Sequence, residues 1–224
     1  FIKECDQSLI KIAKKFPNLR IIIGHPRYFE GSLYNSASIL YKGKIEFTYD
    51  KQILPNYGVF DEKRYFNAGK KSLIFSHDGK KIGLLICEDI WVKGPAETLS
   101  NVDYIICINA SPFEIGKYAA RIKDLKDRVV SDRCTLIYLN LVGGQDDLLF
   151  DGGSFIFNNK YGLIECLEQF KSLNKVIDLK IDEKKVYEYN IKKFDSPIRI
   201  LLDGLILALK DYLSKNSIKN IFIG

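Results

Sequence analysis

The 224-residue sequence has no methionine, one tryptophan and only two histidines, His25 and His77. Neither histidine stands in a recognisable motif, which argues against a hydrolase that uses a Cys/His pair. No apolar run approaches the roughly 20 residues that a membrane-spanning helix needs. The chain also opens on no segment typical of a secretory signal peptide. We therefore expect a protein that works in the cytoplasm without contact with a membrane.

Disulfide and zinc signatures are missing as well. The number of cysteines is odd, and no pair has the C-x-x-C spacing of a redox or zinc motif, so we expect neither a disulfide framework nor a bound metal. The net charge is +6. Its lysines are scattered in pairs with no aromatic-interleaved basic stripe, so we expect no nucleic-acid partner. The five cysteines are Cys5, Cys87, Cys107, Cys134 and Cys166.

The order of helical and strand patterns is typical of an α/β layered domain. Helices are predicted over residues 2–15, near 95–101, over about 115–133 and over 199–214. Strands are predicted over 19–23, 33–41, 44–50, 82–86, 104–108 and 135–141. Residues 42–43 form a hairpin turn, and the range 148–179 contains short strands with turns at 152–153 and 158–159. The long segment 52–67 between predicted strands is typical of a functional loop.

The most informative stretch runs from Lys81 to Trp91, because it leads from an apolar strand directly into a cysteine. Cys87 is followed by Glu88 and Asp89, which suit the first turn of a helix, where unpaired N–H groups favour negative charge. Such a terminus would also stabilise a thiolate, the nucleophilic form of cysteine. The alternative is a cysteine that serves as a small buried hydrophobic residue.

Lys51 is a candidate partner for this cysteine. It stands where the predicted strand 44–50 enters the long loop, and its charge would be useful beside a thiolate and a developing oxyanion. A backbone N–H near Glu88 could supply a second oxyanion donor. The alternative is that Lys51 is an ordinary surface lysine.

Four segments, in order along the chain, carry a resemblance to a known family: residues 49–66, 87–91, 109–113 and 143–154. They resemble the glutaminase domain of glutamine-dependent NAD+ synthetases, a branch of the nitrilase (carbon–nitrogen hydrolase) superfamily. The resemblance implies a four-layer αββα sandwich, here without its first strand. It also implies a glutaminase domain over residues 1–195 and a linker helix and first strand over 196–224, which lead to an ATP-dependent synthetase domain.

The family resemblance also implies roles for individual residues. Cys87 would attack the side-chain amide of glutamine, while Lys51 and the backbone N–H of Glu88 would hold the oxyanion. The acidic side chains of Glu88, Asp89, Asp61 and Glu62 are interpreted as mainly structural partners. Alternatives stay open for Tyr57, as a packed loop aromatic, and for Lys117, as a solvated residue at a helix start. The positions that resemble the substrate pocket are Tyr57, Trp91, Ser111 and Lys117.

One element of the family pattern has no counterpart in this numbering. The general base of the family is a glutamate upstream of the first helix, and neither Glu4 nor Glu30 fits that position. If the protein begins at Phe1, we expect it to be inactive and to lack a core strand. We expect no cofactor in this part, and ATP with Mg²⁺ in the synthetase domain. The expected partners are glutamine, that domain and further copies of the same chain.

Two alternative functions remain open from the sequence. The first is a stand-alone amidase or carbamoylase of the same superfamily. It leaves the terminal helix and the expected strand after it unexplained. The second is a catalytically dead scaffold or oligomerisation module, which the true absence of the upstream glutamate would favour.

Overall fold

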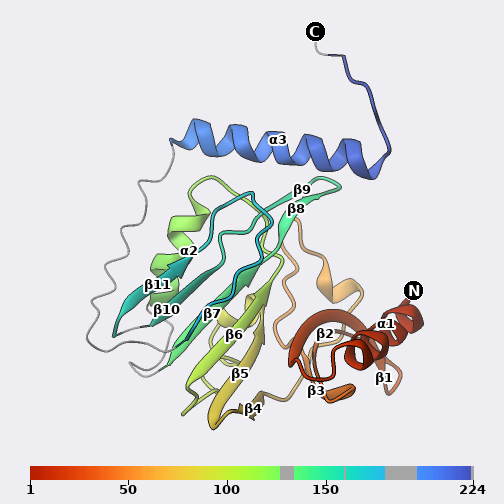
Figure 1. Cartoon of the computed structure of the whole chain (residues 1–224), viewed down its shortest axis with the longest axis vertical. Helices are drawn as coiled ribbons and strands as arrows, with labels where there is room; N and C mark the ends of the chain where they lie inside the picture. Colours follow the sequence, from red (N-terminus) through yellow and green to blue (C-terminus); the bar gives the residue numbers. More distant parts are fainter. Residues whose placement is uncertain (127–133, 159, 180–195, 223–224) are drawn as a thin grey trace. The chain divides into compact units, whose positions relative to one another are not determined.

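Helices separate groups of consecutive strands along the chain in the computed structural model, which describes residues 1–126, 134–158, 160–179 and 196–222 (Figure 1). The chain divides into two units, Phe1–Ile108 and Asn109–Gly224. Each unit has its own buried hydrophobic residues, among them Ile39 and Leu84 in the first, and Leu136 and Phe155 in the second. The α/β class that the sequence predicts is therefore present in both units.

A helix and a three-stranded antiparallel sheet open the first unit. They are α1 (Ile2–Lys15), β1 (Ile21–Phe29), β2 (Ser32–Tyr41) and β3 (Lys44–Asp50), with the order β1-β2-β3. Leu9 and Ala13 on one face of the helix pack against Leu40 of the sheet. The turn between β2 and β3 consists of Lys42 and Gly43, whose φ angles of 49° and 76° suit the two-residue hairpin turn that the sequence predicts.

The strand predicted over 19–23 has different bounds in the structure. Leu19 lies in a turn that its N–H closes by donating to Phe16, so the strand begins two residues later. It then continues to Phe29, because its backbone pairs with β2 as far as the contact of Phe29 with Ser32. Pairing with a neighbouring strand thus overrides the polar character of this segment.

The second sheet of the first unit leads to the candidate cysteine. Strand β5 (Lys80–Ile86) pairs antiparallel with β4 (Leu73–His77) and parallel with β6 (Tyr104–Asn109). Its apolar residues 82–86 are all buried, as expected for a strand with a neighbour on each side. Two short 3-10 helices, η1 (Glu62–Arg64) and η2 (Cys87–Ile90), complete the elements of this unit.

The helix predicted near 95–101 is wrong. These residues form hydrogen-bonded turns, in which Thr98 donates to Gly94 and Leu99 donates to Ala96. Pro95 has no N–H to contribute, and Asn101 has a left-handed φ of 59°, which ends any helical geometry within two turns.

The second unit contains an antiparallel sheet, a hairpin and two helices (Figure 1). Strand β10 (Phe155–Asn158) pairs with β7 (Thr135–Asn140) and with β11 (Gly162–Cys166). Strands β8 (Val142–Gln145) and β9 (Leu148–Asp151) form the hairpin. Helix α2 (Lys117–Lys126) precedes β7, and helix α3 (Pro197–Lys215) packs on the hairpin.

Several predicted boundaries in this unit need correction. Helix α2 begins at residue 117 rather than 115, and residues 127–133 of the prediction lie outside the described residues. Residues 171–179 form no strand, although short strands were expected as far as 179. The turn at 158–159 falls partly outside the described residues. The strand expected over 218–224 is absent over 218–222, and residues 223 and 224 are not described.

Helix α3 confirms the helix predicted over 199–214. Ser196 caps its first turn by accepting a hydrogen bond from the Arg199 N–H, and a proline follows as the first helical residue. Gly204 lies where a side chain would meet Leu149. Asp211 accepts a hydrogen bond of 2.7 Å from the N–H of Gly144, which fixes the helix on the hairpin. No described helix is long and apolar enough to cross a membrane.

Candidate active site

Strand β5 ends in a sharp backbone turn at Cys87, here called the elbow. Ile86 has an extended backbone with φ of −122°, and the next residue, Cys87, has φ of 45°. A left-handed φ is uncommon for a residue other than glycine, and such residues cluster at functional sites. The chain therefore turns sharply at the cysteine, as it does at nucleophile elbows that join a strand to a helix.

The Cys87 thiol lies among charged groups but is itself shielded from water. Burial raises the pKa of Cys87 to about 11; the positive charge of Lys51 lowers it, and Glu88, Glu62 and Asp89 raise it further. The thiolate that the sequence predicted is therefore not the resting form at neutral pH. The physical reason is that η2 has only four residues, so its dipole is too small to outweigh desolvation.

Lys51 is buried, with only 2% of its side chain exposed. Its Nζ donates to Oε1 of Glu62 at 2.6 Å. Its backbone N–H donates to Asn35, and its carbonyl accepts from Gly69. The reading of Lys51 as a surface lysine is wrong, because a buried ammonium group needs a charged partner and Glu62 supplies it.

Glu62 reaches Lys51 from the long loop, through η1. Only 19% of its side chain is exposed. Its Oε2 atom is buried and has no hydrogen-bond partner among the described residues. Buried carboxylate oxygens are usually satisfied, so this atom is available to a donor from a bound molecule.

Asp89 is the most buried acid in the first unit, with no exposed surface. Its Oδ1 accepts hydrogen bonds from the backbone N–H groups of Ile53 at 2.8 Å and Gln52 at 3.1 Å. Its Oδ2 accepts from the Tyr49 hydroxyl at 2.8 Å and from the N–H of Ile86 at 3.3 Å. Burial raises the pKa of Asp89, and these hydrogen bonds act in the opposite direction.

Two aromatic candidates lie beside the elbow. The Tyr57 hydroxyl donates to Oε1 of Glu88 at 2.9 Å, and its ring packs edge-on against Phe60. Burial of the hydroxyl, followed by the hydrogen bond to Glu88, raises the pKa of Tyr57 to about 12. More than half of Tyr57 is exposed, so packing alone does not explain its position. Trp91 follows η2, and its N–H donates to the carbonyl of Glu88.

The other two candidates, Ser111 and Lys117, belong to the second unit. Ser111 is buried, and its N–H donates to Oδ1 of Asn140 at 2.9 Å. Its hydroxyl accepts from Arg121 at 3.1 Å. Lys117 begins α2 and is a third exposed, and its Nζ lies 3.9 Å from a carboxylate oxygen of Glu114. Ser111 is thus fixed by the core, whereas Lys117 is a partly solvated residue at a helix start.

A buried ion pair holds the Ser111 segment in place. The guanidinium of Arg121 contacts both oxygens of Asp151, at 2.9 and 3.0 Å, and its other amino group donates to the carbonyls of Ser111 and Pro112. Asn140 and Gln169 donate to the same Asp151 carboxylate. The arginine and the aspartate are 3% and 1% exposed.

We expect Arg121→Met to destabilise the protein by about 3–5 kcal/mol, because it leaves the Asp151 charge buried without its cation. The measurement is the free energy of unfolding from urea titration. Arg199→Met is the matched control, since Arg199 pairs with Asp203 on the exposed surface of α3 and should cost at most about 1 kcal/mol. Equal losses in the two variants would contradict the structural role of the buried pair.

Comparison with known protein families shows to which family the chain belongs. The family model described as carbon-nitrogen hydrolase matches residues 7–190 of the chain. The chain belongs to the carbon–nitrogen hydrolase family. This membership agrees with a cysteine at a strand-end elbow beside a buried lysine, and the nitrilase-superfamily resemblance drawn from the sequence is confirmed.

Within this family, the carbon–nitrogen hydrolase chain is similar to glutamine-dependent NAD+ synthetases. It is 38% identical to a glutamine-dependent NAD+ synthetase of Acinetobacter baylyi over 87% of its own length, but covers 36% of that protein. A solved glutamine-dependent NAD+ synthetase of Acinetobacter baumannii, in complex with ADP, matches 96% of the chain at 31% identity and a TM-score of 0.80, with 41% of that protein covered.

The wider family shares the fold. The solved carbon–nitrogen hydrolase of Helicobacter pylori matches 76% of the chain and 65% of its own length, with a TM-score of 0.66 and 22% identity. That identity shows the fold alone. The α/β fold class of the nitrilase superfamily, predicted from the sequence, is confirmed by these neighbours.

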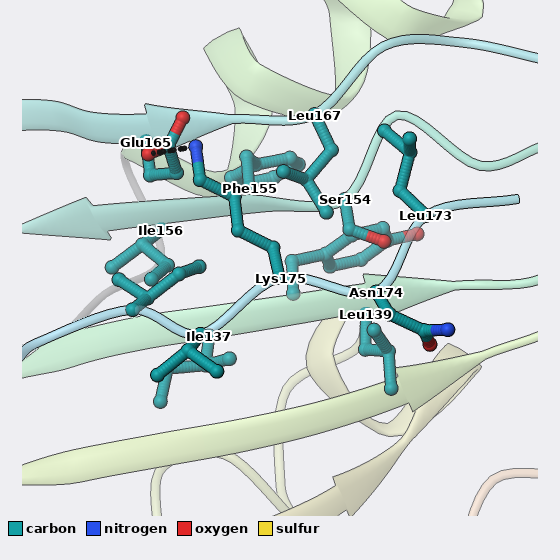
Figure 2. A pocket seen from close by; sticks show the side chains of 13 residues that line it. Ile137, Leu139, Ser154, Phe155, Ile156, Glu165, Leu167, Leu173, Asn174 and Lys175 are labelled. Atoms are coloured by element: carbon teal, nitrogen blue, oxygen red, sulfur yellow. Dashed lines mark hydrogen bonds and ion pairs between the residues drawn. The ribbon is translucent and has the colours of Figure 1, made fainter. Parts of the chain in front are cut away.

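The second unit of this carbon–nitrogen hydrolase chain also contains a cavity of about 390 Å³. Its lining is mostly apolar and comes from β7, β10, β11 and the segment 173–177, as Figure 2 shows. An ion pair between Lys175 and Glu165 stands at its wall, with 2.6 Å between the charged atoms (Figure 2). None of the candidate site residues lines this cavity. Within the described ranges, no group of three or more His, Cys, Asp or Glu side chains could hold a metal ion.

Sequence reasoning did not predict the individual contacts of two acids, Glu62 and Asp89. Both were interpreted as mainly structural partners, and both make hydrogen bonds that bear directly on Lys51 or its neighbours. For Asp89 a signal of burial existed, because an acid three residues after the end of a buried strand is well placed to be buried itself. For Glu62, in a charged loop segment, the sequence offered no such signal.

Proposed function

We propose that this chain carries out the glutaminase half-reaction of a glutamine-dependent NAD+ synthetase. It hydrolyses the side-chain amide of glutamine, and the ammonia serves to amidate nicotinate adenine dinucleotide in a synthetase domain. The observation that carries the proposal is the buried Lys51, held by Glu62 in the charge environment of the elbow cysteine. The similarity to NAD+ synthetases over nearly the whole chain supports the choice of glutamine.

In the proposed mechanism, Sγ of Cys87 attacks the amide carbon of glutamine. The oxyanion of the tetrahedral intermediate is stabilised by the ammonium group of Lys51 and by the backbone N–H of Glu88. The thiol proton passes to a general base and then to the departing nitrogen, so ammonia leaves and a glutamyl thioester remains. Water then attacks the thioester carbon: the C–S bond breaks, a proton from the water restores the thiol, and glutamate leaves.

The protonation state of the Cys87 thiol determines whether the mechanism requires a general base. Because burial keeps Cys87 protonated at rest, a base must take its proton during the attack. The family pattern assigns this role to a glutamate that matches no residue of this sequence. Glu62 has a different role, since its Oε1 fixes Lys51 and its buried Oε2 is available to accept from the amide nitrogen of the substrate.

The remaining assignments rest on the family resemblance. Tyr57, Trp91, Ser111 and Lys117 are proposed to bind glutamine. Residues 1–195 are proposed as the glutaminase domain and residues 196–224 as the linker to the synthetase domain, in which ATP and Mg²⁺ would act. The reaction proposed for this chain uses groups of the protein itself and needs no cofactor. Homo-oligomerisation and a cytoplasmic location are also proposed.

The proposal predicts that an electrophilic diazo-ketone analogue of glutamine alkylates Cys87 selectively. Trypsin releases residues 82–93 as a peptide whose single cysteine is Cys87, and residues 94–117 as one whose single cysteine is Cys107. Mass spectrometry should find the label on the first peptide only, and excess glutamine should prevent it. The matching asparagine analogue, one methylene shorter, is the control and should label weakly. Equal labelling of both peptides, or no protection by glutamine, would overturn the proposal.

A further inference from the structure

We propose that Asp89 is a positioning residue whose buried carboxylate sets the location of Lys51 relative to Cys87, by binding the backbone beside both of them. The inference rests on the proposed function in one respect, which is that Cys87 and Lys51 are the reacting pair. In this role Asp89 fixes the position of Lys51 relative to Cys87, which neither of those two residues can do by itself.

Asp89 holds the backbone that directly follows Lys51. The N–H groups of Gln52 and Ile53, the next two residues, both point to Oδ1 of Asp89, at 3.1 and 2.8 Å. Two consecutive N–H groups on one oxygen define the direction in which the chain leaves β3. The Lys51 backbone itself is held by Asn35 and Gly69, so Asp89 completes the fixation on the side of the loop.

Asp89 also holds the backbone that directly precedes Cys87. The N–H of Ile86 donates to Oδ2 of Asp89 at 3.3 Å, within the same tight turn. The hydroxyl of Tyr49, from the end of β3, donates to this oxygen at 2.8 Å. One carboxylate thus connects the ends of β3 and β5, the two strands that carry the lysine and the cysteine.

The burial of the Asp89 carboxylate makes its hydrogen bonds hard to replace. Tyr49 and Asp89 are both buried, with 1% and 0% exposure, so water cannot replace the carboxylate without a rearrangement. Asparagine at this position keeps one acceptor oxygen but replaces the other with an NH2 donor, so either the N–H groups of Gln52 and Ile53 or the Tyr49 hydroxyl and the Ile86 N–H lose their acceptor in a buried place. The segment after Lys51 is then expected to shift toward solvent, and the ammonium group with it.

The charges around Cys87 make this role distinguishable from a general structural or electrostatic one. The groups that act on its pKa are Lys51, which lowers it, and Glu88, Glu62 and Asp89, which raise it. If Asp89 contributed only its charge, its neutralisation would lower the pKa of Cys87. If it positions Lys51, its loss removes the stabilising cation and the pKa rises instead.

The experiment compares Asp89→Asn with Glu88→Gln in the full-length protein. The readout is the rate of alkylation by iodoacetamide between pH 7 and 9, quantified on the peptide of residues 82–93. Below the pKa, the thiolate fraction and hence the rate change tenfold for each unit of pKa. We expect Asp89→Asn to react about tenfold more slowly than the wild type, and Glu88→Gln, which removes a negative charge without releasing Lys51, to react faster.

Steady-state kinetics give a second readout. We expect kcat for glutamine to fall by about 10² in Asp89→Asn, the usual effect of a displaced catalytic group, with little change in KM. Faster alkylation than in the wild type, or an unchanged kcat, would overturn the proposal. The alkylation assay does not involve glutamine, so a wild-type protein that hydrolyses no glutamine would contradict the proposed function and still leave the role of Asp89 open to test.

A milder variant keeps the test decisive if Asp89→Asn does not fold. Tyr49→Phe removes one of the four donors and no charge, and should slow alkylation in the same direction to a smaller extent. Circular dichroism and thermal melting show whether each variant is folded. Alkylation by a folded Tyr49→Phe variant at the wild-type rate, together with an unfolded Asp89→Asn, would overturn the positioning role in favour of a purely structural one.

Discussion

Cys87→Ala is expected to lower the rate of ammonia release from glutamine by about 10⁴ to 10⁶. Loss of the nucleophile from a catalytic unit removes the covalent pathway, and only the contribution of binding and of the oxyanion donors remains. No other thiol can substitute at the elbow, because the next cysteine, Cys107, is fully buried in β6. The measurement is a coupled assay of ammonia in the full-length protein at saturating glutamine.

Cys107→Ala is the matched control for this prediction. The Cys107 thiol lies 4.0 Å from the carbonyl oxygen of Cys87, so it is a neighbour of the elbow that takes no part in the proposed chemistry. Truncation of a buried cysteine to alanine leaves a small cavity and should cost about 1–2 kcal/mol of stability, with a rate within a few fold of the wild type. Equal rates for the wild type and Cys87→Ala would exclude Cys87 as the nucleophile.

Local sequence signals were sufficient where a single segment determines its own conformation. The hairpin of β2 and β3 follows from Lys42-Gly43, two residues that accept positive φ, between β-rich segments. Helix α3 follows from Ser196 and the proline after it, which cap and start its first turn. The continuous apolar run before Cys87 could hardly be anything but a strand with neighbours on both sides.

Prediction failed where pairing with a distant segment decides the structure. Strand β8 contains Gly143 and Gly144, residues that weaken any local preference for a strand, and it forms because it pairs with β9 and is covered by α3. β1 continues through a polar segment for the same reason, because β2 satisfies its backbone. Strand pairing of this kind depends on tertiary context and leaves little trace in a single sequence.

The residues of the candidate site also divide into those that local sequence predicts and those that depend on tertiary contacts. Cys87 and Lys51 were predictable because each stands at a strand end, which is a property of the local sequence. The contacts of Asp89 and Glu62 were not, because an acid in a charged segment is normally solvated and only the tertiary structure shows which groups these two meet. The environment of the thiol therefore became visible only in the tertiary structure, where burial, more than the nearby acids, raises the pKa of Cys87.

Lys51→Met is expected to lower kcat for glutamine by about 10² to 10³, the range found when one oxyanion donor is removed. Methionine retains much of the length and apolar stem of the lysine but carries no charge. The loss of the ammonium group also removes the positive charge that lowers the pKa of Cys87, so alkylation of that thiol by iodoacetamide should slow as well. Steady-state kinetics and the peptide-resolved alkylation assay measure the two effects independently.

A double variant separates catalysis from stability at this position. Lys51→Met alone leaves the Glu62 charge in a mostly buried place without its cation, so it should also destabilise the protein. Adding Glu62→Gln removes that unpaired charge and should restore much of the stability, while kcat stays low because the oxyanion still lacks its cationic donor. If the double variant recovered activity together with stability, Lys51 would be a structural residue and the oxyanion assignment would be wrong.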